Sequence, residues 1–194
     1  MTTISHRTTD ELEAGLTHIR QSPPDEGVVR LIVRRPNVDQ REVCASATLD
    51  LAEGLVGDNW SRRGSSRTSD GAAHPDMQLN IMNARVVELV AGPMDRWPLA
   101  GDQIYLDMDL SRDNLPPGTR LQLGSAMIEV TAEPHAGCKK FVARFGRDAM
   151  LFVNSGLGKT LCLRGINAKV VQPGEFRVGD VARRITAGQT AASA

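Results

Sequence analysis

The alternation of apolar and polar residues along the chain predicts many short β-strands. Apolar, β-branched and small residues recur at strand spacing over residues 28–35, 42–51, 160–165, 168–172 and 176–185. The clearest pair runs from 119–123 to 126–133 around Gly124-Ser125, a dipeptide suited to a type II′ hairpin turn. Pro36 and Asn37 mark a turn between the first two predicted strands.

Helical spacing occurs in three places. A first helix is predicted over residues 8–21, where Thr8 is placed to cap the chain and leucine and isoleucine residues fall on one face. A second begins after the cap residue Asn83 and ends at Gly92. A third covers residues 138–146, with its glycine as the end.

This mixture favours a mostly antiparallel β-barrel with a few short helices over a parallel βαβ sheet. The chain has 194 residues, which suits one domain. We expect an N-terminal helix and linker over residues 1–26, a barrel domain over 27–186 and a flexible tail over 187–194. Residues 61–76 are too polar and too rich in Gly and Ser to bury much surface, so a long loop is expected there.

Composition removes several classes of function. Basic and acidic residues balance at 23 each, and only 4% of residues are aromatic, so neither a basic surface for duplex nucleic acid nor stacking platforms for single strands are expected. No apolar run has the length of a membrane span or of a signal peptide core. A soluble, cytoplasmic protein without membrane or nucleic-acid partners is predicted.

One glycine-rich segment, GLGKT at residues 156–160, is similar to the end of a phosphate-binding loop. The match is incomplete because Val153 occupies the position where such a loop needs its first glycine, and a strand rather than a helix is expected to follow. A turn between a helix and a strand is the preferred interpretation.

The three cysteines form no CxxC pair, so neither a disulfide framework nor a zinc knuckle is indicated. Cys44 and Cys162 lie within predicted strands, where a buried thiol acts as a small apolar group. Cys138 instead follows a loop at the predicted start of a helix, beside two lysines and three residues after His135. Nearby positive charge favours a reactive thiolate, with His135 as base or charge partner. The competing interpretation, packing of Cys138 in the core beside Phe141, stays open at this stage.

Several short segments follow one another along the chain. These are GLVGDNW at 54–60, QLNIMN before a helix, AGD at 100–102, PPGTRLQLGSAMIEVT, the cysteine loop EPHAGCKKF, LRGINAKVVQPG and FRVGD at 176–180. Taken together, these segments and their order make the sequence resemble the MOSC family, named after the C-terminal domain of molybdenum cofactor sulfurase. The resemblance covers residues 28–186.

The resemblance implies a barrel of the pyruvate kinase barrel-like type, with the family's cysteine at Cys138. Family members are thought to carry sulfur as a cysteine persulfide, or to bind the molybdenum cofactor with that cysteine as a ligand to the metal. Some take part in the reduction of N-hydroxylated compounds. Here the cysteine loop reads HAGC, and Gln103 follows Asp102 where many members have Asn, which leaves the type of substrate and cofactor open.

The chain has no room for a desulfurase domain and no ferredoxin cysteine set, so the resemblance implies a partner protein that donates sulfur or electrons. Pyridoxal phosphate is a poor candidate, because its enzymes use a lysine in a much larger domain. The expected ligand is the anionic molybdenum cofactor, molybdopterin, or another small anionic molecule. The oligomeric state is left open.

An anionic pterin needs cationic side chains around the thiolate. The candidates are Lys139, Lys140 and Arg164, and Gly165 after the arginine permits close backbone approach. The polar rim candidates are Asp58, Gln78 and Asp102. For Arg164 a solvent-exposed strand end, and for the two aspartates a turn or cap, are the competing interpretations.

The long polar loop carries Arg62, Arg63 and Arg67, which could close over an anion or simply keep the loop solvated. His6 and His74 have no partner at metal-ligand spacing. Our leading hypothesis is a sulfurtransferase-like or molybdenum-cofactor-dependent protein that acts through Cys138 with His135. The alternative is a non-catalytic module that binds an anionic ligand or a partner protein.

Overall fold

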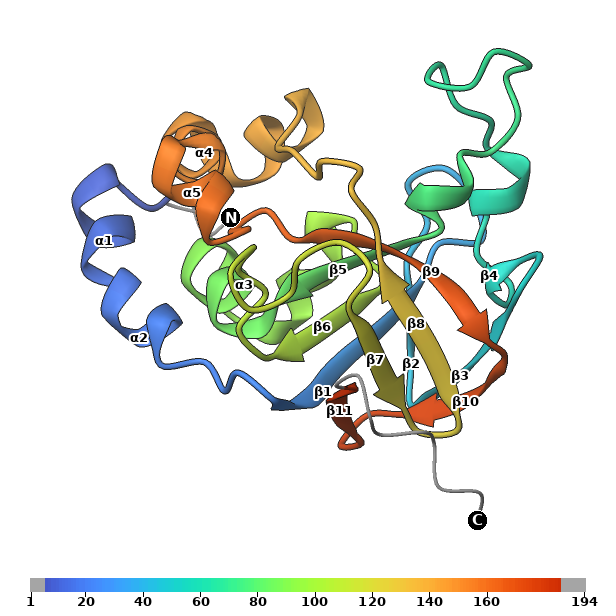
Figure 1. The fold of residues 1–194 in the computed structure, drawn as a ribbon. Coiled ribbons are helices and arrows are strands. Elements are labelled where there is room, and N and C mark those ends of the chain that lie inside the picture. Colours follow the sequence, from blue (N-terminus) through green and yellow to red (C-terminus); the bar gives the residue numbers. More distant parts are fainter. Residues whose placement is uncertain (1–5, 186–194) are drawn as a thin grey trace.

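The computed structural model describes residues 6–185, which form a closed seven-stranded β-barrel with helices against one side (Figure 1). Around the barrel the order is β11-β7-β8-β9-β5-β6-β1, and pairing of β1 with β11 closes it. These strands are β1 (Glu26–Arg34), β5 (Leu79–Asn83), β6 (Ile104–Asp107), β7 (Arg120–Leu123), β8 (Ala126–Val130), β9 (Ile166–Gln172) and β11 (Val181–Ile185). Among the strands of residues 6–185 only β5 and β6 pair in parallel, so the predicted mostly antiparallel barrel is confirmed.

A few strands lie outside the closed ring. β2 (Glu42–Cys44) pairs with the end of β1, and a small sheet of β10 (Gly174–Arg177), β3 (Ser46–Asp50) and β4 (Gly54–Leu55) lies beside it. Two predicted strands are therefore each divided. The run over 42–51 breaks between β2 and β3, and the run over 176–185 breaks between β10 and β11.

The predicted hairpin between β7 and β8 is confirmed. Leu123 pairs with Ala126 across the turn, and Gly124 has a φ of 55°. Ser125 has no positive φ, and positive φ at the first central residue alone is the signature of type II′. A Cβ atom at Gly124 would collide with the carbonyl oxygen of Glu175.

The first predicted helix is divided at Gly15, whose backbone dihedrals stay close to helical values. Its halves are α1 (Thr9–Ala14) and α2 (Leu16–Arg20), and Gly15 between them lies against Leu89 of α3 (Ala84–Ala91), leaving no room for a Cβ atom. The predicted cap is present, since the Thr8 hydroxyl accepts from the backbone N–H of Glu11.

The third predicted helix does not end at Gly146. That residue has a φ of 89° and kinks the chain, and α4 (Lys139–Asn154) resumes beyond it because Ala149 and Val153 bury against the core. α5 (Gly156–Thr160) follows.

The strand predicted over 160–165 is wrong. Thr160 ends α5, the next residues form turns, and Cys162 has a φ of 48°, a left-handed conformation that no strand accommodates. Cys162 is half-buried rather than part of a pleated face. The GLGKT segment is this short helix, so the interpretation as a simple turn is also wrong.

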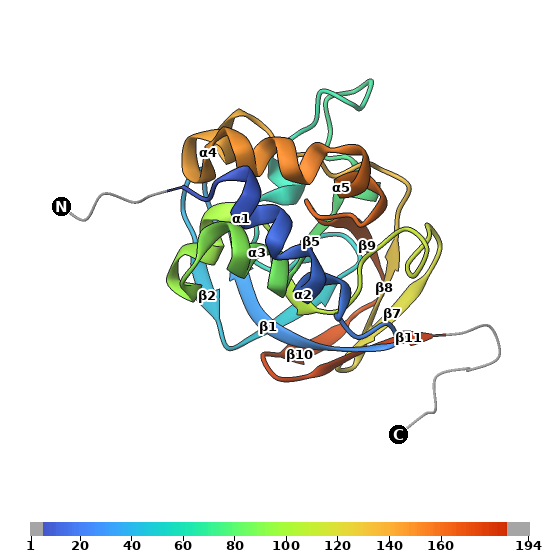
Figure 2. The ribbon, with the colours of Figure 1, turned by 90° about the vertical axis from the view of Figure 1, so that its left-hand side faces the viewer.

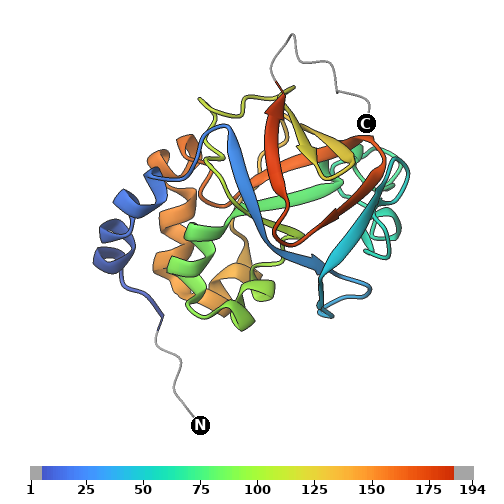
Figure 3. The ribbon, with the colours of Figure 1, turned by 90° about the horizontal axis from the view of Figure 1, so that it is seen from below.

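Two apolar clusters share the barrel wall. One fills the barrel interior, and the other lies between the outer face of the barrel and helices α1, α3 and α4. Figures 2 and 3 show from two sides how these helices lie against the barrel. A β-bulge between Val29 and Leu31 in β1 sends Val29 and Ile32 to the interior while Leu31 and Val33 face the helices. The end of β1 is thereby buried on both sides, next to Arg35.

The polar segment 61–76 projects from the barrel as the predicted long loop, with 3₁₀ turns at Trp60–Arg62 and Pro75–Met77 (Figure 1). Arg67 anchors it to Glu133, with 2.8 Å between Nη1 and Oε2. No helix within residues 6–185 is long and apolar enough to cross a bilayer. The tail predicted over 187–194 lies outside the described residues.

Candidate functional site

The loop that carries Cys138 is fastened at both ends by asparagine side chains. At its start, Asn167 of β9 donates from Nδ2 to the carbonyl oxygen of Glu133 at 3.1 Å. At its end, Asn154 accepts from the backbone N–H of Gly137 at 2.9 Å and donates back to the Gly137 carbonyl at 3.2 Å. The loop between β8 and α4 therefore has a defined path, and it ends with Cys138 as the N-cap residue of α4.

His135 of this loop forms a triad with the buried side chains of Asp102 and Arg164. The Asp102 carboxylate is fully buried and accepts from Arg164 Nη1 at 3.0 Å and 2.8 Å, one distance to each oxygen. His135 Nε2 lies 2.8 Å from Asp102 Oδ1. Arg164 also donates from Nη2 to the Ala100 carbonyl at 2.9 Å and stacks over the Phe141 ring, with its guanidinium carbon 5.0 Å from the ring centroid.

The triad fixes the protonation of His135. Burial would raise the pKa of Asp102, but the charges of Arg164 and then His135 outweigh it and hold that pKa below its ordinary value. Burial, and then the positive charge of Arg164, lowers the pKa of His135 against the opposing pull of Asp102. The ring is therefore neutral at pH 7. Because an ionised carboxylate only accepts, Nε2 carries the hydrogen and Nδ1 is left as a proton acceptor.

Gly165 brings the triad and the barrel wall together. Its φ is 111°, and a Cβ atom there would collide with the Ile81 carbonyl oxygen and lie 3.2 Å from Cδ2 of His135. The expectation that this glycine serves close approach beside Arg164 matches what the backbone does here.

A pocket opens beside the triad, enclosing about 240 Å³. We call it the cationic pocket. Its lining includes Cys138, His135, Asp39 and Asn59 together with six cationic side chains, which are Arg35, Arg41, Arg63, Lys140, Arg144 and Arg164. Cys138 is exposed, and its sulfur makes no hydrogen bond within residues 6–185. The alternative in which Cys138 packs in the core is therefore wrong.

The cationic pocket has an excess of positive charge. Three carboxylates face its six cations: Asp58 pairs with Arg35, Asp102 with Arg164, and Asp39 is shared by Lys140 at 3.2 Å and Arg144 at 3.1 Å. Three positive charges thus remain uncompensated by carboxylates of residues 6–185. Burial, followed by the charges of Arg144 and Arg35, lowers the pKa of Arg41. An anion in the pocket would relieve this repulsion.

Arg35 links the cationic pocket by hydrogen bonds to buried polar side chains of the barrel. It donates from Nε at 2.8 Å and Nη2 at 2.9 Å to the two oxygens of Asp58, and from Nη1 to Asn80 Oδ1 at 2.9 Å. Asn80 in turn donates to Asn167 Oδ1 at 2.6 Å. A continuous buried chain of hydrogen bonds therefore runs from Asp58 to the asparagine that fastens the cysteine loop.

The structure brings together some of the predicted site residues and separates others. Cys138, His135, Lys140 and Arg164 line the cationic pocket, and Asp102 lies directly behind two of them. Lys139 is exposed and does not line it.

Asp58 and Gln78 are buried structural groups rather than rim residues. Gln78 accepts from the backbone N–H of Val170 at 2.7 Å and donates to the Leu51 carbonyl at 2.9 Å, so both ends of its amide are occupied by backbone groups. Both oxygens of Asp58 are taken by Arg35.

The arginines of the polar loop divide among three roles. Arg63 lines the cationic pocket, Arg62 donates to the Pro36 carbonyl at 3.0 Å, and Arg67 holds Glu133. Only one of the three is thus placed to meet an anion.

Several residues of the cationic pocket were not predicted from the sequence. These are Arg35, Arg41, Arg144 and Asn59. Arg144 lies on the exposed side of a predicted helix, where a solvated arginine is the ordinary expectation. Within residues 6–185 there is no cluster of three or more His, Cys, Asp or Glu side chains able to hold a metal ion. Among these residues Cys138 is the only thiol that lines the pocket, where Met77 adds a thioether, so the soft ligands on offer are one thiolate and one thioether.

No protein-family model matches the sequence, and no curated protein is significantly similar to it. Solved structures do share the fold. YuaD from Bacillus subtilis superposes with a TM-score of 0.57 and 18% identity, over 81% of this chain and 94% of that one. YiiM from Escherichia coli gives 0.53 and 19% over 84% and 72%, and YiiM from Geobacillus stearothermophilus gives 0.54 and 14% over 82% and 75%. These likenesses show a MOSC-like fold.

Proposed function

We propose that this protein binds an anionic metal cofactor of the molybdopterin class in the cationic pocket, with the Cys138 thiolate as a ligand to the metal. The observation that carries the proposal is an exposed, unbonded thiol on the wall of a pocket whose six cations exceed its carboxylates by three. A thiolate is the soft ligand that such a metal takes, and arginines are the side chains that grip phosphate.

The polar groups of the pocket fit this cofactor. Asn59 Oδ1 is a buried acceptor and Arg164 Nε a buried donor, and neither has a hydrogen-bond partner within residues 6–185. A pterin carries ring N–H donors and a phosphate carries acceptors, so the two groups would be satisfied by different parts of one ligand. The volume of about 240 Å³ lies below the roughly 300–1,000 Å³ of pockets that enclose a whole drug-sized ligand. The pocket would hold the charged end and leave the remainder at its mouth.

The residues around the thiol then have separable roles. Arg41 and Arg63 attract the anion, while Arg35 and Arg164 are held rigidly by Asp58 and Asp102 and fix its position. The neutral ring of His135, oriented by Asp102, offers Nδ1 to take up a proton at the site. When bound, the cofactor would supply two-electron oxidation and reduction.

Cofactor content of variants tests this proposal. Protein purified anaerobically from a host that makes the cofactor should contain molybdenum and pterin in near-stoichiometric amounts, and Cys138→Ala should lose most of the metal. Cys44→Ala is the matched control, because Cys44 is a half-buried thiol outside the cationic pocket. Equal metal content in wild type and Cys138→Ala would contradict the assignment of the ligand.

A second candidate function is persulfide carriage, favoured by the exposure of the Cys138 sulfur. In this step the Cys138 thiolate attacks the outer sulfur of a donor persulfide, a new S–S bond forms at Cys138, and the donor's cysteine leaves as a thiolate. Incubation with a desulfurase and cysteine should then add one sulfur atom to the Cys138 peptide, seen by mass spectrometry and removed by reductant. Metal-free wild type that stays unmodified would exclude this function and leave a binding module.

A further inference from the structure

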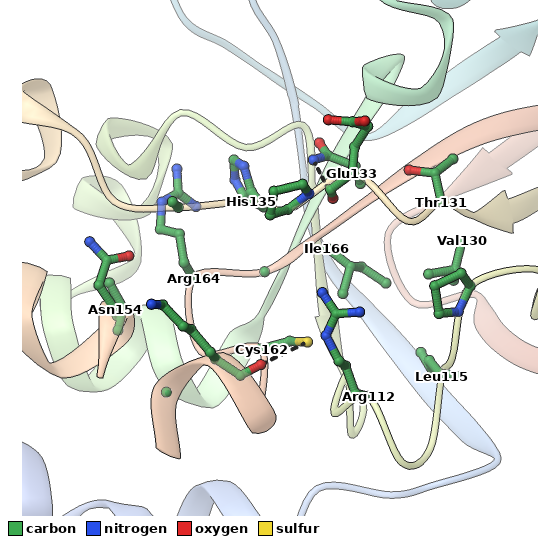
Figure 4. Close-up of a pocket in the computed structure, with 18 residues that line it drawn as sticks. Arg112, Leu115, Val130, Thr131, Glu133, His135, Asn154, Cys162, Arg164 and Ile166 are labelled. Atoms are coloured by element: carbon green, nitrogen blue, oxygen red, sulfur yellow. Dashed lines mark hydrogen bonds between the residues drawn. The ribbon is translucent and has the colours of Figure 1, made fainter. Parts of the chain in front are cut away.

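A second pocket lies on the other side of the triad, and nothing in the proposed function uses it. It encloses about 300 Å³ and is lined by residues of the segments 112–117, 130–136, 153–159 and 162–167. Figure 4 shows Arg164 and His135 on one side of this pocket and Leu115 and Val130 on the opposite side.

The second pocket has an apolar body. Leu115, Val130, Val153 and Ile166 are buried side chains that line it. A dry cavity of about 150 Å³ with a similar lining is enough to hold benzene, so about 300 Å³ accommodates one aromatic ring and a short side chain.

The charged groups of this pocket are mostly cationic. Arg112 and Lys159 line it, and neither side chain has a carboxylate partner within residues 6–185. Its one acidic residue, Glu133, is held by Arg67 at 2.8 Å. Lys159 belongs to the GLGKT segment, which thus presents its lysine to this pocket although it forms no phosphate loop.

The two pockets share part of their lining. His135, Ala136 and Arg164 line both of them. Arg164 Nε is buried without a hydrogen-bond partner within residues 6–185, in a side chain only 7% exposed. Because that donor is assigned above to the cofactor phosphate, Arg112 and Lys159 are the cations of the second pocket left to meet an anion.

We propose that the second pocket binds a small carboxylate with an apolar body, such as an arylalkanoate, with its ring against Leu115 and Ile166 and its carboxylate toward Arg112. The binding itself depends on no part of Cys138. That this ligand is a substrate, with His135 exchanging a proton between it and the thiol site, rests on the proposed function.

Binding of 3-phenylpropionate to the full chain, measured by calorimetry, tests the site. We expect 3-phenylpropanol, which lacks the charge, and propionate, which lacks the ring, to bind at least about tenfold more weakly, the effect of losing one charge-assisted hydrogen bond or the apolar contact. Arg112→Gln should weaken 3-phenylpropionate by about the same factor. Arg177→Gln is the matched control, since Arg177 is 78% exposed on β10 and lines neither pocket.

Cysteine protection locates the ligand. Cys162 lines the second pocket and Cys44 does not, so saturating 3-phenylpropionate should slow alkylation of Cys162 at mildly alkaline pH while Cys44 reacts at its original rate. Cys138→Ala should retain the affinity, which separates this site from the proposed cofactor site. Absence of binding at millimolar concentration, or binding that neither protects Cys162 nor responds to Arg112→Gln, overturns the proposal.

Discussion

Asp102→Asn is the substitution that most directly tests whether the buried triad holds the site together. The wild-type carboxylate is fully buried and accepts from Arg164 at 3.0 Å and 2.8 Å and from His135 at 2.8 Å. Asparagine keeps the shape but removes the negative charge and turns one acceptor into a donor facing the guanidinium. Arg164 would then be an uncompensated cation in a side chain 7% exposed, a change that costs about 3–5 kcal/mol.

Urea unfolding at pH 7.5 measures this cost. The control is Glu26→Gln, which breaks the pair between Glu26 and Arg183 at 2.8 Å, where the two side chains are 63% and 62% exposed. Exposed pairs of this kind contribute about 0.2–1 kcal/mol. If Asp102→Asn lost no more free energy of unfolding than Glu26→Gln, the argument that burial makes this triad a rigid part of the site would be refuted.

Two further predictions concern His135 and Gly165, which both line the second pocket. The pKa of His135 in the folded protein lies below its usual 6.5, so as the pH falls the unfolded chain takes up this proton before the folded one does. The contribution of His135 to the free energy of unfolding is therefore complete above pH 6.5. It decreases as the pH drops below 6.5, by at most about 1.4 kcal/mol per pH unit. His135→Gln should flatten that slope in unfolding experiments run from pH 7.5 to 5, and an unchanged slope would assign it to other groups. Gly165→Ala should destabilise the fold by about 2–3 kcal/mol, more than Gly92→Ala does. Both glycines have positive φ, but only Gly165 lies against the Ile81 carbonyl. Equal losses of stability in thermal unfolding would contradict a role for this close approach.

The elements that sequence reasoning located are those with local signals. The hairpin at Gly124-Ser125 and the helix capped by Asn83 depend on two to four neighbouring residues, and both are present, with Asn83 accepting from the N–H groups of Arg85 and Val86. The loop with His135 and Cys138 was singled out as a candidate for the same reason, since these two residues and the start of α4 lie within a few residues of one another.

Elements without such signals were missed or misread. β5 is buried at all five positions, so it lacks the alternation that marks a half-exposed strand. The opposite error occurred at residues 160–165, where a short apolar run was read as a strand. Cys162 takes a left-handed conformation there, and apolar composition contains no information about that backbone.

The ion pairs of the site join residues far apart in sequence, yet they share a local feature. Asp58 follows Gly57 and Asp102 follows Gly101, both glycines with positive φ at 82° and 93°. Each aspartate is turned inward, and the two arginines that they hold flank strands, Arg35 just after β1 and Arg164 just before β9. The separations are 23 and 62 residues.

The same dipeptide occurs a third time, at Gly179-Asp180, and shows what decides its role. Gly179 has a φ of 93°, but Asp180 accepts from Arg177, whose side chain is 78% exposed, so this copy only closes a surface turn. The Gly-Asp signal therefore fixes the backbone in all three places, and burial alone separates a turn from a carboxylate that holds a pocket arginine. Burial depends on the closed barrel, in which β1 and β9 come together through β5 and β6. For this reason the three motifs were visible in the sequence, while the assignment of the first two to the site required the structure.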